Sequence, residues 1–352
     1  MAEKPKEDTD ENQFRAARIE KLKALKALGV DPYPYGFQRS AEAKEIEARY
    51  AALAPGAVTE DRVAVAGRIR AIRNSGMFID LHDTSGKIQI FSHKDHLPPD
   101  QLALVKLLDL GDLIGVEGVV RRTPRGELTI NSTKITILAK ALLPLPEKFH
   151  GLADIETRYR QRYLDLIMSE ESRETLRRRS RIIATLRRML IGEGFLEVET
   201  PMLHAIPGGA SAKPFVTHHH ALDLELYLRI APELHLKRLL VGGLSEKLFE
   251  INRNFRNEGL SPRHNPEFTS LEIYDAYADY TGMMALVEEL VCRAADEVTG
   301  GLVIEYGGTT IDLTPPWPRR TMAELVEEAT GIDFLGLDAG AAREAANGLG
   351  AG

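Results

Sequence analysis

Alternation of polar and apolar residues is clearest over residues 246–280, where it predicts two strands joined by a polar loop. Successive side chains of a strand point to opposite faces, so one face of this hairpin is apolar and the other is polar. The polar face gathers Arg256, Phe268, Glu272 and Tyr274. A solvated antiparallel hairpin is the alternative, because it shows the same alternation. Two aromatic side chains on the polar face favour a binding face for a polyanion with a flat ring and for a second, cationic ligand.

Short alternating segments between residues 62 and 138 predict an all-β domain with one helix inside it. Three strands, a helix and two strands follow one another, separated by glycine-containing turns. This is the order of the oligonucleotide-binding fold, a five-stranded barrel that binds single-stranded nucleic acid on strands 2 and 3 and adjoining loops. Those places hold Arg73, Phe78, Gln89 and Glu127. Phe78 is expected to stack on a base, unless it belongs to the core, and Gln89 and Glu127 to bond base edges.

The chain before the barrel has a polar tail, residues 1–12, which we expect to be disordered. Helical periodicity then predicts helices over residues 13–28 and 41–53. The first of these has a face rich in arginine and lysine. That face is either solvated or lies against a phosphate backbone, which would attract it electrostatically.

After the barrel the pattern changes from alternation to longer helical periods mixed with short strands. It predicts helices over 171–192, 233–243, 282–298 and 321–330 and strands over 194–203 and 224–230. Pro201 is expected to end the regular pairing of the first strand, because it has no amide hydrogen to donate. The expected fold is therefore α+β and multidomain. We expect a tail and helical arm over 1–60, the barrel over 61–145, a linker and dimer-contact segment over 146–172, and a catalytic domain over 173–352.

Composition narrows the class of protein further. The net charge of −7 over 352 residues argues against an overall cationic coat for nucleic acid, though not against a local basic face. Cys292 is the single cysteine, so no disulfide can form within the chain and a reducing compartment is expected. No apolar stretch approaches the ~20 residues that span a membrane, so we expect a soluble cytoplasmic protein. The run His218–His220 is not expected to bind metal, because adjacent residues do not easily converge on one tetrahedral ion.

Several segments resemble bacterial class II lysyl-tRNA synthetases, and the resemblance covers nearly the whole chain. GFLEVETPML resembles the first class II motif, a dimer-interface helix and strand with Pro201 as its signature residue. FRNEG followed by RHNPEF resembles the second motif. The segments more specific to the lysine enzymes are IPGGASAKPF, YLRIAPELHLKRL, EINRNFRNEG and KFHGLADIETRYRQRYLDL.

The resemblance implies roles for individual side chains. Arg256 would hold the α-phosphate of ATP and the lysine carboxylate, Phe268 would stack on adenine, and Glu233 would bind the α-ammonium group. The implied lysine-binding residues are Gly209, Glu233, Arg256, Glu272 and Tyr274, with the last two facing the ε-ammonium group. The implied ATP-binding residues are Arg256, Glu258, His264, Asn265 and Phe268. In the barrel, Arg73, Phe78, Gln89 and Glu127 would recognise the uridine-rich lysine anticodon.

The activity implied by the resemblance is that of a lysine–tRNA ligase. Such an enzyme activates L-lysine with ATP to lysyl-adenylate and transfers lysine to the 3′ end of lysine tRNA. The resemblance also implies a homodimer that uses Mg²⁺. In the family, a third motif supplies the magnesium-binding carboxylates. No third motif occurs before Gly352, so we expect no metal ligands in this chain and an incomplete class II antiparallel-sheet domain, as in a fragment of a longer enzyme.

Two other interpretations remain open at this point. One is a truncated, non-catalytic relative that binds tRNA through the barrel alone. The other is a synthetase-like enzyme that transfers lysine to a protein, which is disfavoured because such relatives lack the anticodon barrel.

Overall fold

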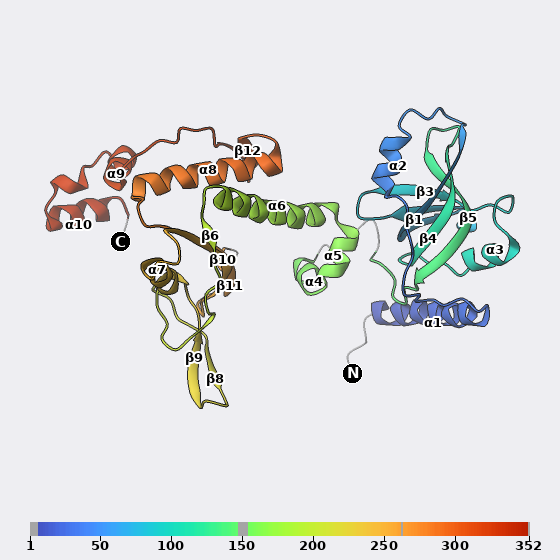
Figure 1. Ribbon diagram of the computed structural model, residues 1–352, viewed down its shortest axis with the longest axis horizontal. Coiled ribbons are helices and arrows are strands. Elements are labelled where there is room, and N and C mark those ends of the chain that lie inside the picture. Colours follow the sequence, from blue (N-terminus) through green and yellow to red (C-terminus); the bar gives the residue numbers. More distant parts are fainter. Residues whose placement is uncertain (1–5, 147–153, 262, 351–352) are drawn as a thin grey trace. The chain divides into compact units, whose positions relative to one another are not determined.

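The structure, a computed structural model, describes residues 6–146, 154–261 and 263–350 (Figure 1). The chain divides into two compact units, Met1–Glu170 and Glu171–Gly352, each described here by itself. The first part of the KFHGLAD segment, at residues 148–153, lies outside the described residues. No helix among the described residues is long and apolar enough to span a membrane.

The first unit contains the predicted five-stranded barrel. Its elements are β1 (Val58–Arg73), β2 (Phe78–His82), β3 (Lys87–Phe91), α3 (Pro99–Val105), β4 (Leu113–Arg122) and β5 (Leu128–Ala139). The strands close in the order β1-β2-β3-β5-β4, and only the β3–β5 pair is parallel. Inward-facing side chains such as Ile79, Ile90 and Ile130 are fully buried and form the core. Closure leaves the barrel without an exposed edge strand, so its outer faces are fixed by the packing inside.

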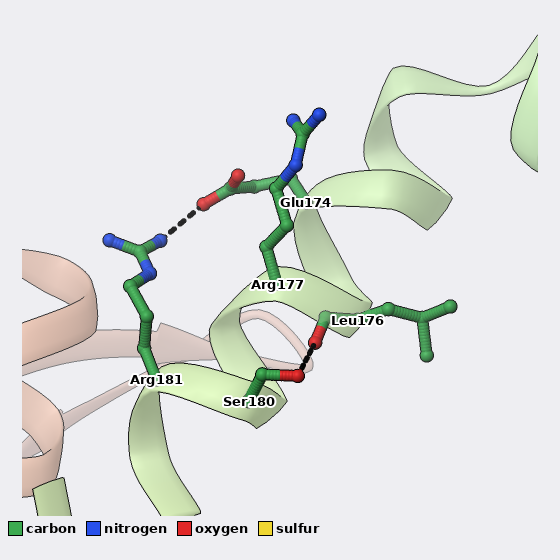
Figure 2. A pocket seen from close by; sticks show the side chains of 5 residues that line it. All are labelled: Glu174, Leu176, Arg177, Ser180 and Arg181. Atoms are coloured by element: carbon green, nitrogen blue, oxygen red, sulfur yellow. Dashed lines mark hydrogen bonds and ion pairs between the residues drawn. The ribbon is translucent and has the colours of Figure 1, made fainter. Parts of the chain in front are cut away.

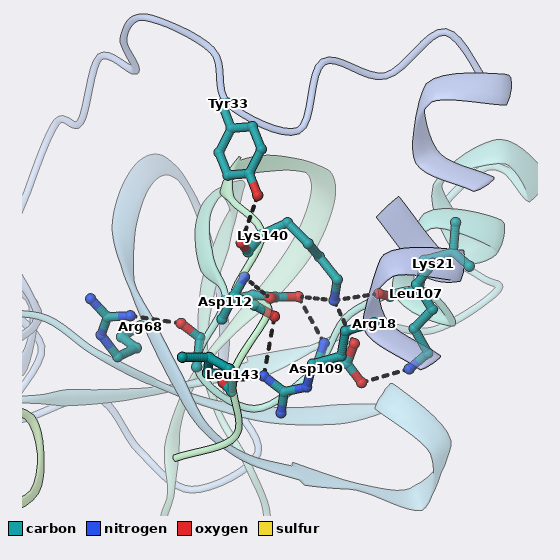
Figure 3. Close-up of polar contacts among 11 residues, drawn as sticks. Arg18, Lys21, Tyr33, Arg68, Leu107, Asp109, Asp112, Lys140 and Leu143 are labelled. Carbon is teal, nitrogen blue, oxygen red and sulfur yellow. Dashed lines mark hydrogen bonds and ion pairs between the residues drawn. The ribbon is translucent and has the colours of Figure 1, made fainter. Parts of the chain in front are cut away.

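Helix α1 (Lys6–Ala27) begins earlier than expected, so residues 6–12 are helical and not a disordered tail. Helix α2 (Ala43–Arg49) is shorter than the predicted 41–53 segment. Two basic side chains of α1, Arg18 and Lys21, make contacts within this unit (Figure 3). Arg18 donates to the carbonyl oxygens of Ala141 and Leu143, at 3.1 and 2.7 Å, and Lys21 donates to Asp109 at 2.6 Å. Those two side chains are therefore not available to a phosphate backbone.

A buried lysine organises this end of the barrel (Figure 3). Lys140 Nζ lies 2.5 Å from a carboxylate oxygen of Asp109 and 2.8 Å from one of Asp112. Lys21 of α1 reaches the other oxygen of Asp109 at 2.6 Å. The lysine hydrogen bonds and charges hold the pKa of Asp109 below its usual value, although burial opposes them. The network connects α1, the segment before β4 and the residue that follows β5.

Two short helices, α4 (Ile155–Arg160) and α5 (Arg162–Met168), complete this unit. They are linked by Asp165, which forms ion pairs with Arg158 and Arg162.

The second unit begins with α6 (Glu170–Gly192), the long helix that the sequence predicts. The predicted 194–203 strand is reduced to β6 (Leu196–Glu197) and β7 (Leu203–His204), with Pro201 between them. Proline has no amide hydrogen for a strand ladder, which accounts for the break. Strands β8 (Val216–His219) and β9 (Leu224–Leu228) form a hairpin paired with β7, and α7 (Glu233–Val241) follows.

The central sheet of this unit is β11-β10-β6, built from β10 (Lys247–Phe255) and β11 (Glu267–Asp275). These are the two strands predicted from residues 246–280, and they pair antiparallel with Glu250 opposite Glu272. The apolar face packs against α6 and α8 (Tyr280–Thr299), which lie over the same side of the sheet (Figure 1). Its buried cluster is Leu190, Phe195, Phe249 and Leu290. The opposite, polar face of the hairpin is left uncovered by these helices.

The remaining elements are β12 (Val303–Tyr306), β13 (Thr309–Asp312), α9 (Met322–Thr330), a 3₁₀ turn (Phe334–Gly336) and α10 (Ala339–Gly348). Capping residues set both ends of α9. Thr321 and Glu324 form a capping box at the start of α9, and Gly331 ends it with φ 74°. Cys292 is buried, as expected of a core residue, with its Sγ 3.2 Å from the carbonyl oxygen of Leu313.

Candidate functional site

Two rows of side chains run across the outer face of the barrel. In the first row, Arg73 of β1 pairs with Phe78 of β2, and Phe78 pairs with Phe91 of β3. In the second row, Asp80, Gln89, Thr129 and Arg121 are paired in turn across β2, β3, β5 and β4. Residues directly opposite each other in a sheet share a face, so the register brings three predicted contacts, Arg73, Phe78 and Gln89, to one surface.

These rows border a hollow of about 620 Å³. It is lined by Arg73, Asn74, Phe78, Gln89, Arg121, Thr123, Pro124, Arg125 and Glu127. All four barrel residues singled out from the sequence are among them. Phe78 is partly exposed and lines the hollow, so it is not a core residue. The hollow has the aromatic side chain, hydrogen-bonding groups and charges that a single-stranded nucleic acid needs.

Two of the charged residues that line this hollow, Arg73 and Glu127, are already paired. Arg73 makes two hydrogen bonds to the Asp80 carboxylate, at 2.8 and 3.0 Å. Glu127 lies 3.2 Å from Lys87 across the neighbouring strands. Asp80 and Lys87 were not singled out from the sequence. Alternation along β2 places Asp80 on the same face as Phe78, so the strand period could have predicted that Asp80 lies beside this hollow.

The second candidate site is the polar face of the β10–β11 hairpin. Phe268, Glu272 and Tyr274 lie on it as predicted, because residues two apart on β11 point to the same side. Glu233 begins α7, which packs beside β10 and β11. Gly209 lies next to it: a Cβ placed on Gly209 would be 3.1 Å from the Cβ of Glu233. The backbone there also has φ +89°, which favours glycine.

The acidic part of this face is partly buried. The Tyr274 hydroxyl donates to Glu272 at 3.0 Å. Burial raises the pKa of Glu272 above its usual value, and the nearby carboxylates of Glu233 and Glu250 raise it further, while the Tyr274 hydrogen bond opposes them. Burial and Glu272 also raise the pKa of Tyr274. Carboxylates held close together with a phenol attract a cation, since an ammonium ion would relieve their repulsion.

A buried ion pair lies beside these carboxylates, because Glu250 is directly opposite Glu272 in the sheet. Arg229 is fully buried, Glu250 is 1% exposed, and Nη1 of Arg229 lies 2.8 Å from Glu250. Glu250 also accepts a 2.7 Å hydrogen bond from the Thr200 hydroxyl and a 3.1 Å bond from Asn252. Because its oxygens are occupied, Glu250 supports the site and does not present a free carboxylate. The period of two along β10 places Glu250 on the polar face, opposite Glu272, but it gives no sign that Arg229, from outside the hairpin, neutralises it.

The anion-binding end of the face centres on Arg256, just beyond β10. Its guanidinium carbon lies 5.2 Å from the centroid of the Phe268 ring, and its backbone amide donates to Pro266 at 2.8 Å. Nε of Arg256 and Oδ1 of Asn254 are buried without hydrogen-bond partners among the described residues. A buried donor of this kind is costly unless a ligand satisfies it, so this end is suited to an anion next to a flat ring.

The loop residues predicted for nucleotide binding make their contacts elsewhere, and among the described residues none of them bonds to Arg256 or Phe268. Glu258 accepts a 3.3 Å hydrogen bond from the Lys213 amide, and His264 Nδ1 lies 2.7 Å from the Ser261 hydroxyl. Asn265 is exposed on the same loop. Pro262 of this loop lies outside the described residues.

Other features of the second unit do not form a comparable site. His218 lies 3.4 Å from His220 and 3.0 Å from Asp223 at the end of the β8–β9 hairpin. In the described part of the chain, no three His, Cys, Asp or Glu side chains are placed to hold a metal ion. A hollow of about 610 Å³ along α6 is lined by residues of that helix alone, including the pair Arg181–Glu174 at 2.6 Å (Figure 2).

Comparison with known proteins gives two matched families. Residues 154–344 match the family described as tRNA synthetases class II (D, K and N), and residues 63–138 match the OB-fold nucleic acid binding domain. A lysine–tRNA ligase of Sinorhizobium medicae is 57% identical over 320 residues, which is 91% of this chain and 64% of that protein. One from Rhizobium etli is 53% identical over 96% of this chain and 68% of its own length. One from Carboxydothermus hydrogenoformans is 54% identical over 93% and 66%. The chain therefore spans about two thirds of the length of these relatives.

Proposed function

The chain belongs to the class II tRNA synthetases of the aspartate, lysine and asparagine group, in which its relatives are lysine–tRNA ligases, and we propose that it carries the lysine-activating and anticodon-reading parts of such an enzyme. Its substrates would be L-lysine, ATP and lysine tRNA. The observation that carries the proposal is the order of groups along the polar face of the β10–β11 hairpin: Arg256 over Phe268 at one end, and Glu272 with Tyr274 at the other.

The amino-acid selectivity follows from charge. Lysine brings two ammonium groups, and the face offers the carboxylates of Glu233 and Glu272. Glu233 is now paired with Lys237 at 2.6 Å on the surface of α7, and an exposed i,i+4 pair of this kind is weak enough for a ligand to displace. Aspartate and asparagine lack the side-chain cation, so they would leave the raised-pKa carboxylate of Glu272 without a partner.

The reaction needs positioning and charge neutralisation more than covalent help from the protein. The lysine carboxylate would attack the α-phosphorus of ATP, forming the acyl–phosphate bond of lysyl-adenylate and releasing pyrophosphate. Arg256 would hold both anions, because a guanidinium presents donors in a fixed fork to two oxygens at once. The acyl group would then pass to the ribose hydroxyl at the 3′ end of tRNA, releasing AMP. In the described residues no cluster fits Mg²⁺, so no step is assigned to the metal here.

The assembly is also part of the proposal. We infer a homodimer formed through the region of α6 and Pro201, which resembles the first class II motif. Analytical ultracentrifugation of the chain would test it. We further propose that the enzyme acts in the cytoplasm, in keeping with its single, buried cysteine.

The test is ATP–pyrophosphate exchange by this chain with lysine, aspartate or asparagine. Exchange that depends on lysine alone would support the proposal, and exchange with aspartate or asparagine would overturn the assigned selectivity. Calorimetric binding of lysine gives a second readout that does not require turnover. A chain that binds neither lysine nor ATP but retains a lysine anticodon stem–loop would instead be a non-catalytic tRNA-binding relative.

A further inference from the structure

Arg121 occupies a position in the barrel that the sequence did not single out. It stands near the end of β4 and pairs with Thr129, which in turn pairs with Gln89 on β3. It lines the same hollow as Phe78 and Gln89. The chain separates Arg121 from Phe78 by more than forty residues, and the strand pairing of the closed barrel brings the two side chains to one surface.

The charge of Arg121 is not balanced. Arg73 is paired with Asp80 and Lys87 with Glu127, whereas Arg121 forms no ion pair with any described residue. Its Nε is buried and has no hydrogen-bond partner there. Burial lowers its pKa, yet a guanidinium stays protonated at neutral pH. A partly buried cation without a counter-ion is unfavourable, and an incoming anion would remove that cost.

An aromatic ring fixes the direction of this side chain. The Arg121 guanidinium carbon lies 4.3 Å from the centroid of the Phe91 ring, a cation–π distance. Phe91 also contacts Phe78, with ring centroids 5.1 Å apart. A base stacked on Phe78 and an anion held by Arg121 would therefore be separated by a single aromatic ring.

We propose that Arg121 binds a backbone phosphate of the RNA whose base stacks on Phe78. The inference rests on the proposed anticodon-reading function and extends it to a residue that grips RNA whatever its sequence. Every nucleotide carries a phosphate, and contacts of this kind position an RNA without reading its bases. Arginine suits the role because its planar fork matches phosphate oxygens while its flat face remains on Phe91.

The experiment measures binding of the full chain to two stem–loop RNAs by fluorescence anisotropy over a range of salt concentrations. One RNA has a UUU anticodon, and in the other the three uridines are replaced by cytidines. Arg121→Gln should weaken both RNAs by the same factor, about tenfold. It should also reduce the slope of log affinity against log salt by about 0.7, the value for one phosphate of a single strand.

Two further variants separate charge from folding. Arg121→Lys keeps the charge but loses the flat fork, so it should retain the salt slope and lose less affinity than Arg121→Gln. Lys134→Gln removes an exposed cation of β5 outside the hollow and should leave both affinities unchanged. Thermal unfolding of each variant shows whether the barrel is intact, and the lysine variant remains informative if the glutamine variant is unstable.

The proposal is overturned if Arg121→Gln binds both RNAs as tightly as the wild type. It is also overturned if only the UUU RNA is weakened and the salt slope stays the same, since Arg121 would then read a base. A wild-type chain that binds both RNAs equally would contradict anticodon reading, while the common loss in Arg121→Gln would still reveal the phosphate contact.

Discussion

The barrel and the β10–β11 hairpin support their candidate sites in different ways. Phe78 and Gln89 in the barrel are backed by buried neighbours, Ile79 for Phe78 and Ile88 and Ile90 for Gln89, and the closed sheet encloses its own core. The hairpin packs against a core on one face only, a cluster of four buried apolar residues to which α6 and α8 also contribute. Its polar face depends instead on the ion pair of Arg229 and Glu250. Apolar packing thus holds the first site, and buried charge holds the second.

This difference implies that stability and binding are separable in the barrel and coupled in the hairpin. Removing a side chain from the outer face of the barrel leaves the core intact. Removing either Arg229 or Glu250 leaves the other charge buried and unpaired, which is among the costliest single changes in a protein. The following expectations test that contrast, in order of decreasing effect.

Arg229→Met should have the largest effect, because it leaves Glu250 buried without its partner. We expect the free energy of unfolding of the second unit to fall by about 3–5 kcal/mol. Trp317, the single tryptophan, lies in this unit, so its fluorescence during denaturation reports it directly. Binding of RNA by the barrel should be unchanged.

A matched control is Arg253→Met, which removes an exposed arginine of β10 that lies 3.5 Å from Glu267. Exposed pairs contribute about 0–1 kcal/mol, so this variant should unfold almost as the wild type does. Equal losses in the two variants would refute the special role of the buried pair.

Glu272→Gln should weaken lysine binding by about 1.5–3 kcal/mol, the range for a hydrogen bond to a charged group. Calorimetry with lysine measures this loss. Glu267→Gln, on the same strand but the opposite face, is the control and should bind lysine normally. A loss shared by both variants would mean that a general reduction of negative charge, and not the position of Glu272, is responsible.

The raised pKa of Glu272 also predicts a pH dependence. Because the folded state holds this proton more tightly than the unfolded state, Glu272 makes stability fall as pH rises from the usual carboxyl range through the raised pKa. Over the same interval lysine affinity should increase, since the ionised carboxylate binds the ammonium group. Lysine affinity measured across that range should rise in the wild type and be flatter in Glu272→Gln. Parallel profiles for the two proteins would show that another group is responsible.

Phe78→Ala should weaken binding of a UUU stem–loop by about 1–3 kcal/mol through lost base stacking. Since Phe78 stands outside the barrel core, thermal unfolding of the first unit should change little. A large drop in barrel stability with unaltered RNA affinity would reverse the contrast drawn above, because Phe78 would then act as a core residue.

The smallest effect is expected for Lys87→Gln. Its pair with Glu127 is close to half exposed on both sides, so the barrel should lose about 0.2–1 kcal/mol at most. Chemical denaturation followed by circular dichroism measures it. A larger loss would show that surface charge contributes to a barrel that we regard as held by its apolar core.

Local patterns were enough to predict the five barrel strands, the long helix α6 and the two strands β10 and β11. They also placed Phe268, Glu272 and Tyr274 on one face. Those features depend on the period of a strand or helix, which is set by neighbours along the chain. The same patterns were wrong for residues 6–12, where the local signal was weak.

Tertiary structure alone decided which distant charges meet. Arg229 reaches Glu250, and Arg121 joins the barrel hollow through Phe91. Each contact depends on strand pairing or packing between segments far apart in the sequence, and a one-residue shift in register would move every side chain of a strand to the other face. The chain pattern specifies which face a residue takes, whereas the partner across that face is fixed only when the sheets form.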